Sequence, residues 1–290
     1  MAKIVMAAVF FFSFLAGGSG MNVKAAGAED FATWLWNPWM MVDDEAGTLA
    51  FLESKNVNKV YLQIDRDIPQ SVYRSFIEKA SAKGMKVYAL DGAPNWVAPN
   101  GYLSLDQLVN WIKTYQNGSS PLQRFTGIHL DVEPYLYSGW SSKQAATVKT
   151  YQALLLKAKS SAASLNIPLE ADLPFWFDEI SYKNTYGKGI LAEWVIANTS
   201  GVTIMAYRDS APMIIELVKN EVGYAGKYNK KLVIGVETGQ TNEGNMISFF
   251  EEGEAYLDQE LEKVKSFYAG TPGYSGIAVH HVGSWLTMKP

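Results

Sequence analysis

Short β-like segments and longer helix-like segments alternate along the chain from about residue 29 to its end. The β-like segments are rich in branched and aromatic residues, and the segments between them have the apolar spacing of amphipathic helices. Strands separated by helices pair in parallel, so this order predicts a parallel sheet covered by helices. The expected strands are 33–36, 59–64, 86–91, 127–133, 169–173, 203–207, 232–237 and 276–280.

Eight units of this kind close naturally into a (β/α)8 barrel, and residues 29–290 have the usual length of one. An open doubly wound sheet is the competing architecture. Its nucleotide-binding turns, Gly-x-Gly-x-x-Gly or Gly-x4-Gly-Lys-Ser/Thr, follow none of the expected strands. We therefore predict an α/β fold consisting of a single TIM barrel, with expected helices at 46–55, 70–83, 105–115, 142–164, 189–197, 211–228 and 253–268.

Residues 1–28 have the pattern of an export signal. Lys3 supplies a positive start, residues 4–16 are mostly apolar, and the small residues that end at Ala28 fit a cleavage site. The apolar run is short for a membrane span and is broken by Gly17-Gly18-Ser19-Gly20. We expect cleavage after Ala28 and a mature protein that is secreted, extracellular or wall-associated, and not attached to the membrane.

Composition excludes several classes of chemistry. The chain has no cysteine, which rules out disulfides, a thiol nucleophile and a thiolate zinc site. A formal net charge of -4 argues against nucleic acid as a partner. The three histidines include the adjacent pair His280 and His281, which would point to opposite faces of a strand, so we expect neither a metal nor another cofactor. We also expect a monomer.

The expected strand 127–133 carries polar groups on one face. Side chains alternate along a strand, so His129, Asp131 and Glu133 should face one way and the apolar residues between them the other. A half-exposed edge strand whose polar face meets water would also explain this pattern. In a barrel, however, active sites lie at the carboxyl ends of the strands, where such groups serve acid-base chemistry.

Other acidic and aromatic residues follow the expected strand ends. Glu237 ends an apolar strand as Glu133 does, whereas loop aspartates such as Asp65, Asp67 and Asp178 are often only caps of helices or turns. Indole rings pack on the C–H faces of sugars, and polar groups bind their hydroxyls. We therefore expect a sugar site whose candidate binding residues are Trp36, Asp91, Trp96, His129, Asp172, Trp176, Asp209 and His280.

Residues 126–133 resemble the strand-four signature of the family 18 glycoside hydrolases, Asp-Gly-x-Asp-x-Asp-x-Glu, and keep its Gly, its last Asp and its Glu. Met205-Ala206-Tyr207-Arg208 is similar to the Met-x-Tyr-Asp/Asn of strand six of that family, and 231–236 to its strand-seven entry. The family comprises chitinases, endo-β-N-acetylglucosaminidases and related spore and cell-wall proteins. The resemblance, which covers the chain from about strand four onward, implies a polysaccharide substrate that contains N-acetylglucosamine, such as chitin or a cell-wall glycan.

The resemblance also implies roles for three catalytic residues. Glu133 would be the general acid, Asp131 would orient the N-acetyl group of the substrate, which attacks the anomeric carbon, and Tyr207 would steady that group. The sequence departs from the family at Thr126 and His129, which replace the first two aspartates of the signature. The family's Ser-x-Gly-Gly of strand three is absent from 87–92, and its strand-eight Trp is replaced near His280.

These departures leave two alternatives open. In the first, Glu133 is the acid and Glu237 the nucleophile, as in the large clan of retaining glycosidases with these residues on strands four and seven, although the Asn-Glu pair of that clan is Val132-Glu133 here. This mechanism requires carboxyl groups about 5 to 5.5 Å apart. In the second alternative, the chain is a catalytically inactive carbohydrate-binding barrel.

Overall fold

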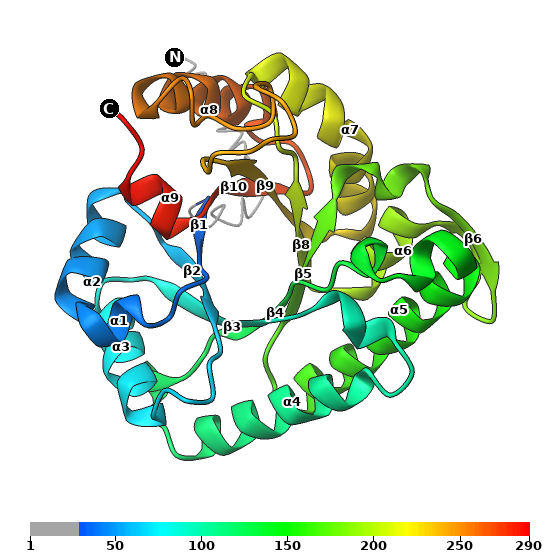
Figure 1. The fold of residues 1–290 in the computed structure, drawn as a ribbon, viewed down its shortest axis with the longest axis horizontal. Helices are drawn as coiled ribbons and strands as arrows, with labels where there is room; N and C mark the ends of the chain where they lie inside the picture. Colours follow the sequence, from blue (N-terminus) through cyan, green and yellow to red (C-terminus); the bar gives the residue numbers. More distant parts are fainter. Residues whose placement is uncertain (1–28) are drawn as a thin grey trace, which may run out of the picture.

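Eight parallel strands close into a barrel in the computed structural model, which describes residues 29–290 (Figure 1). Around the barrel the strand order is β1-β10-β9-β8-β5-β4-β3-β2. The predicted single (β/α)8 barrel is confirmed. The bounds are β1 (Asp30–Leu35), β2 (Lys59–Gln63), β3 (Lys86–Asp91), β4 (Gly127–Leu130), β5 (Leu169–Pro174), β8 (Gly201–Met205), β9 (Lys231–Glu237) and β10 (Tyr274–His280).

Helices form a ring outside the barrel (Figure 1). In α3, for example, Tyr73, Phe76, Ile77 and Ala80 recur at three- and four-residue intervals and are buried against the strands. This helix ends just before Gly84, whose φ of 81° suits a glycine. The helices are α1 (Met40–Asp43), α2 (Glu45–Ser54), α3 (Gln70–Ala82), α4 (Tyr102–Asn117), α5 (Gly139–Ser164), α6 (Leu191–Asn198), α7 (Ala211–Tyr228), α8 (Glu254–Tyr268) and α9 (Val282–Leu286).

Two local features differ from the sequence-based expectation. A hairpin of β6 (Ser181–Asn184) and β7 (Gly187–Ile190) precedes α6, where we expected the helix to begin at residue 189. Its turn is stabilised by the Asn184 side chain, which accepts a hydrogen bond from the backbone of Tyr186. Strand β4 ends three residues earlier than expected: its pairing with β3 stops at Leu130, opposite the last residue of β3, and the 3-10 helix Pro134–Leu136 follows.

Large aromatic rings fill the middle of the barrel, where branched aliphatic residues are usual. Trp34, Tyr61 and Tyr88 come from the neighbouring strands β1, β2 and β3 and are buried. Glycines make room for them. A Cβ atom on Gly127 would lie 2.3 Å from the ring of Tyr88, and one on Gly235 would lie 3.1 Å from Trp34.

A buried ion network lies at the amino-terminal end of the barrel. Lys59 Nζ is 2.7 Å from Glu170 Oε2 and 3.2 Å from Asp30 Oδ2, and Lys86 Nζ is 3.1 Å from Asp30 Oδ1. Burial would raise the pKa of Glu170, but Lys59 and His129 outweigh it and lower the pKa to about 2. Charged groups are therefore present inside this barrel from its amino-terminal end, at Lys59 and Glu170, to His129.

The expected export signal at 1–28 and its cleavage site lie outside the described residues. Within residues 29–290, none of the helices combines the length and the apolar character needed to cross a membrane.

Candidate active site

The chain leaves β4 through Asp131, Val132 and Glu133 at the carboxyl end of the barrel. The N–H of Asp131 donates to the Asp91 carbonyl on β3 at 3.2 Å, which extends the sheet pairing by one residue. The backbone of Asp131 can approach closely because residue 92 is glycine, where a Cβ atom would lie 2.0 Å from the Asp131 carbonyl oxygen. Glu133 then precedes the short 3-10 helix Pro134–Leu136.

Glu133 is held in a partly buried, aromatic environment. The hydroxyl of Tyr135 donates to Glu133 Oε1, and the ring of Tyr135 packs edge-on against Trp176 at 5.1 Å. Trp176 also packs against Trp140 at 6.0 Å. Burial raises the pKa of Glu133, with the charge of Asp172 adding to the effect, while the Tyr135 hydrogen bond and His280 oppose it. A carboxyl group whose proton is stabilised in this way is suited to act as a general acid.

Asp131 is a buried neighbour of Glu133 and Asp172. Its Oδ1 atom is buried and accepts no hydrogen bond from any residue in the described chain. Burial raises its pKa well above the usual range, and the charges of Asp172 and Glu133 raise it further, whereas His129 lowers it. Asp131 is therefore a carboxyl group that binds its proton unusually tightly.

His129 and Asp172 form an ion pair inside the barrel. His129 Nε2 is 2.9 Å from Asp172 Oδ1, and the imidazole stacks on Tyr61 at 3.7 Å between ring centroids. Asp172 Oδ2 accepts a hydrogen bond from Trp34 Nε1 at 3.0 Å. Burial would lower the pKa of His129, but Asp172 and Glu170 overcome this and raise it to about 9. The pair lies too deep to touch a polysaccharide directly, since both side chains are almost completely buried.

Glu237 ends β9 and is fixed by three donors. Its Oε1 accepts from the backbone N–H groups of Thr238 and Gly239 at 2.8 and 2.6 Å, and its Oε2 lies 2.7 Å from His280 Nδ1. The other imidazole nitrogen, Nε2, accepts from Trp36 Nε1 at 2.8 Å. His280 therefore carries its proton on Nδ1 and donates it to Glu237. Burial opposes ionisation of Glu237, but these hydrogen bonds and His280 lower its pKa, so the group is ionised.

Tyr207 lies where these groups meet. Its ring is 5.7 Å from that of His280. Burial raises the pKa of Tyr207 well above its usual value, and the charges of Glu237, Asp172, Asp131 and Glu133 all raise it further. The structure thus brings together the four carboxyl groups and the tyrosine that the sequence suggested from strands β4, β5, β8 and β9.

Three other suggested residues have different surroundings. Asp91 pairs with Arg66 at 3.1 Å, and its pKa is raised by burial against the opposing charge of Arg66. Trp96 is only 4% exposed and packs in the apolar core, which leaves no ring face for a sugar. Asp209 donates its N–H to the carbonyl of Met246, and the charged groups that affect its pKa are Glu251, Glu260 and Arg208.

An open cleft of about 610 Å³ begins at Trp36 and follows the loops after β1 and β2. Trp39 is 42% exposed there, and its Nε1 donates to Asp65 Oδ2 at 2.9 Å, so one ring is presented to solvent in a fixed orientation. Gln63, Arg66 and Asp67 supply polar groups around it. This arrangement of a ring with polar neighbours suits a sugar unit.

The candidate residues chosen from the sequence do not include Trp34, Tyr135 and Trp39. Trp34 falls within a strand and looked like core, and Tyr135 acts through its hydroxyl on a residue only two positions away. Trp39 follows a strand end, so its position was a usable signal.

In residues 29–290, no group of three or more His, Asp or Glu side chains is arranged to hold a metal ion.

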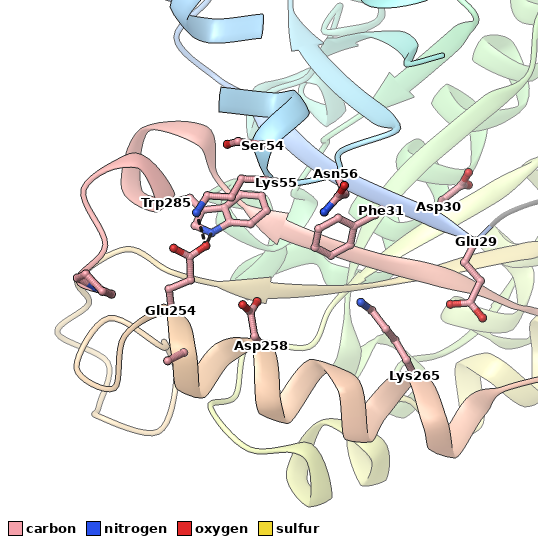
Figure 2. A pocket seen from close by; sticks show the side chains of 12 residues that line it. Glu29, Asp30, Phe31, Ser54, Lys55, Asn56, Glu254, Asp258, Lys265 and Trp285 are labelled. Carbon is pink, nitrogen blue, oxygen red and sulfur yellow. Dashed lines mark hydrogen bonds and ion pairs between the residues drawn. The ribbon is translucent and has the colours of Figure 1, made fainter. Parts of the chain in front are cut away.

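The cavity of about 700 Å³ in Figure 2 lies outside this site, on the flank of the barrel between α2 and α8. Lys55 bonds to Glu254 across it, and Trp285 forms part of its wall. It is separated from the strand ends that carry Glu133, and we assign it no role in the site.

The fold is similar to that of solved chitinases. The chitinase of Chromobacterium violaceum has a TM-score of 0.56 at 11% identity, with 90% of this chain and 97% of that chain covered. A family 18 chitinase of Cycas revoluta, solved in complex with (GlcNAc)4, has a TM-score of 0.55 at 11% identity, with 89% and 96% covered. The Bacillus megaterium spore cortex-lytic enzyme SleL has a TM-score of 0.53 at 14% identity, with 90% and 73% covered.

These likenesses confirm the predicted family 18-like barrel at the level of the fold. No family model matches the sequence, and no curated protein matches it.

Proposed function

We propose that this protein is a glycoside hydrolase that acts on a polysaccharide containing N-acetylglucosamine, with Glu133 as its general acid. The observation that carries the proposal is the position of Glu133 at the carboxyl end of β4, where burial raises its pKa and Tyr135 orients it. The barrel similarity to chitinases, one of them holding (GlcNAc)4, supports the same substrate class.

In the proposed reaction, Glu133 donates its proton to the glycosidic oxygen as the bond from that oxygen to the anomeric carbon breaks. The carbonyl oxygen of the substrate's own N-acetyl group forms the new bond to the anomeric carbon. Water then attacks that carbon, Glu133 takes a proton from the water, and the N-acetyl group is restored. Asp131 holds the N-acetyl group in place, and the Tyr207 hydroxyl steadies it.

The cleft beside Trp36 supports binding of an oligosaccharide rather than a single sugar, because Trp39 lies beyond the catalytic residues along the loops after β1 and β2. Trp36 connects the two regions, since its indole N–H bonds to His280.

Residues 1–28 have the pattern of an export signal, so we propose that the enzyme works outside the cell. Mass analysis of secreted protein should find Glu29 as its first residue, and retention of residues 1–28 would indicate a membrane anchor instead.

A retaining mechanism with Glu237 as nucleophile is the second candidate. One observation favours it: the environments of Glu133 and Glu237 move their pKa values in opposite directions, as an acid and a nucleophile require. Against it, both oxygens of Glu237 are engaged by Thr238, Gly239 and His280. Glu237 therefore fits a residue that fixes His280 at least as well as one that attacks a sugar.

Glu133→Gln tests the proposal because the amide keeps the shape of the side chain but cannot donate a proton of useful acidity. We expect roughly 100- to 10,000-fold slower release of products from N-acetylchitooligosaccharides or peptidoglycan fragments. Binding measured by calorimetry should be nearly unchanged. A wild-type protein that binds these glycans but hydrolyses none of them would instead identify a carbohydrate-binding barrel.

A further inference from the structure

The most unusual feature of the site is a buried histidine where the family 18 signature has its second aspartate. His129 lies on the inner face of β4, two residues before Asp131, and is completely buried. An imidazole in this place needs a partner, because burial of an unpaired charge is costly. That partner comes from the next strand.

The pairing of β4 and β5 explains why the partner is Asp172. Residues Leu130 and Ala171 are opposite each other, so the next position along both strands brings Asp131 and Asp172 to the same level. In this low-dielectric interior the charge of Asp172 raises the pKa of Asp131. Asp172 has His129 Nε2 at ion-pair distance, 2.9 Å, from Oδ1, and its Oδ2 accepts a hydrogen bond from Trp34. Asp131 has no ion-pair partner among residues 29–290, and its buried Oδ1 accepts no hydrogen bond there.

Asp172 is the carboxyl group that lies nearest to the His129 imidazole, at 2.9 Å. The second carboxylate near the imidazole, Glu170, lies farther away, at 3.8 Å from Nδ1, and is already paired with Lys59 at 2.7 Å. Tyr61, stacked on the other side, contributes a ring rather than a charge. The groups that face His129 are thus Asp172 and Glu170 from β5, Tyr61 from β2 and Asp131 from the residues directly after β4.

We propose that the His129–Asp172 ion pair is the positioning device of this site: it holds Asp172 in place beside Asp131 and so keeps the proton of the Asp131 carboxyl group next to Glu133. Asp131 in this state offers a carbonyl oxygen to the N–H of a substrate acetamido group and an O–H to Glu133. His129 and Asp172 act through Asp131 and do not touch substrate. This inference rests on the proposed function for its catalytic consequence, but not for the pairing itself.

The pairing can be tested on the wild-type protein by NMR of the histidine rings and the aspartate carboxyl groups. The His129 imidazole should remain protonated at pH 8, and the Asp131 carboxyl should remain protonated at pH 7. His281 provides an internal control, since burial and His280 lower its pKa and its ring should be neutral at pH 8. A neutral His129 ring at pH 8, or an ionised Asp131 at pH 7, would overturn the proposal whether or not the protein hydrolyses glycans.

The positioning role is tested by replacing His129 with aspartate, the residue that the family 18 signature has at this position, first alone and then together with a change at Asp172. His129→Asp alone places three carboxyl groups together, and we expect product release to slow at least 100-fold. Adding Asp172→Asn removes the excess carboxylate and should recover at least tenfold of that loss, mainly in kcat rather than KM. A double variant no faster than His129→Asp, with both variants folded by circular dichroism, would contradict the proposal. Complete inactivity of the wild type would contradict the proposed function and leave the NMR result standing.

Discussion

At the scale of single residues, the question is what each carboxyl group does. Glu133 and Asp131 have raised pKa values and Glu237 a lowered one, and each shift has an identified cause in burial or hydrogen bonding. If the N-acetyl group of the substrate is the nucleophile, Glu237→Gln should slow product release less than tenfold, because Glu237 only fixes His280. Glu216→Gln is a matched control, since that side chain is 71% exposed on α7. A loss of 100-fold or more that azide partly restores would make Glu237 the nucleophile.

At the scale of elements, the site depends on how closely two loops approach each other. Gly92, directly after β3, lies against the backbone of Asp131 after β4, and a Cβ atom there would overlap the Asp131 carbonyl oxygen at 2.0 Å. Gly92→Ala should therefore push Asp131 away, lowering stability by about 1 to 3 kcal/mol and turnover by at least tenfold. Gly223→Ala, on α7 with nothing within 4 Å of the new methyl group, should be neutral or stabilising. Equal effects of the two substitutions on urea unfolding and turnover would contradict this account.

At the scale of the whole molecule, stability should depend on pH through the buried charges. The pKa of His129 is raised from 6.5 to about 9 in the folded protein, so its contribution is fully present below pH 6.5 and is lost as pH rises through 9. We expect urea unfolding to show a loss of up to about 3 kcal/mol between these values. The His129→Gln variant should have a smaller free energy of unfolding than the wild type at pH 6.5. Above that pH, its free energy of unfolding should change less with pH. The same slope in both proteins would show that His129 is not the group responsible.

The sequence by itself determined the barrel and the position of its chemistry. Apolar strands alternating with amphipathic helices leave a parallel closed sheet as the consistent solution, and strand ends of such a sheet converge at one mouth. Glu133, Asp131, Tyr207 and Glu237 could therefore be proposed together although the first and the last of them are more than a hundred positions apart in the chain. Local turn chemistry was harder to read: most of the hairpin of β6 and β7 was assigned to no element, and its last two residues, Gly189 and Ile190, were placed at the start of a helix.

Only the tertiary structure decided which of these groups carry charge and which carry protons. That outcome depends on contacts between strands: His129 with Asp172, Trp36 with His280, and Lys59 with Glu170. Sequence spacing sets which face of a strand a residue occupies, but the register between strands sets its neighbours. Burial then strengthens the effect of those neighbours on the pKa of each group, because water no longer screens the charges. A charge in a low-dielectric interior is stabilised only by the partner that the fold brings to it.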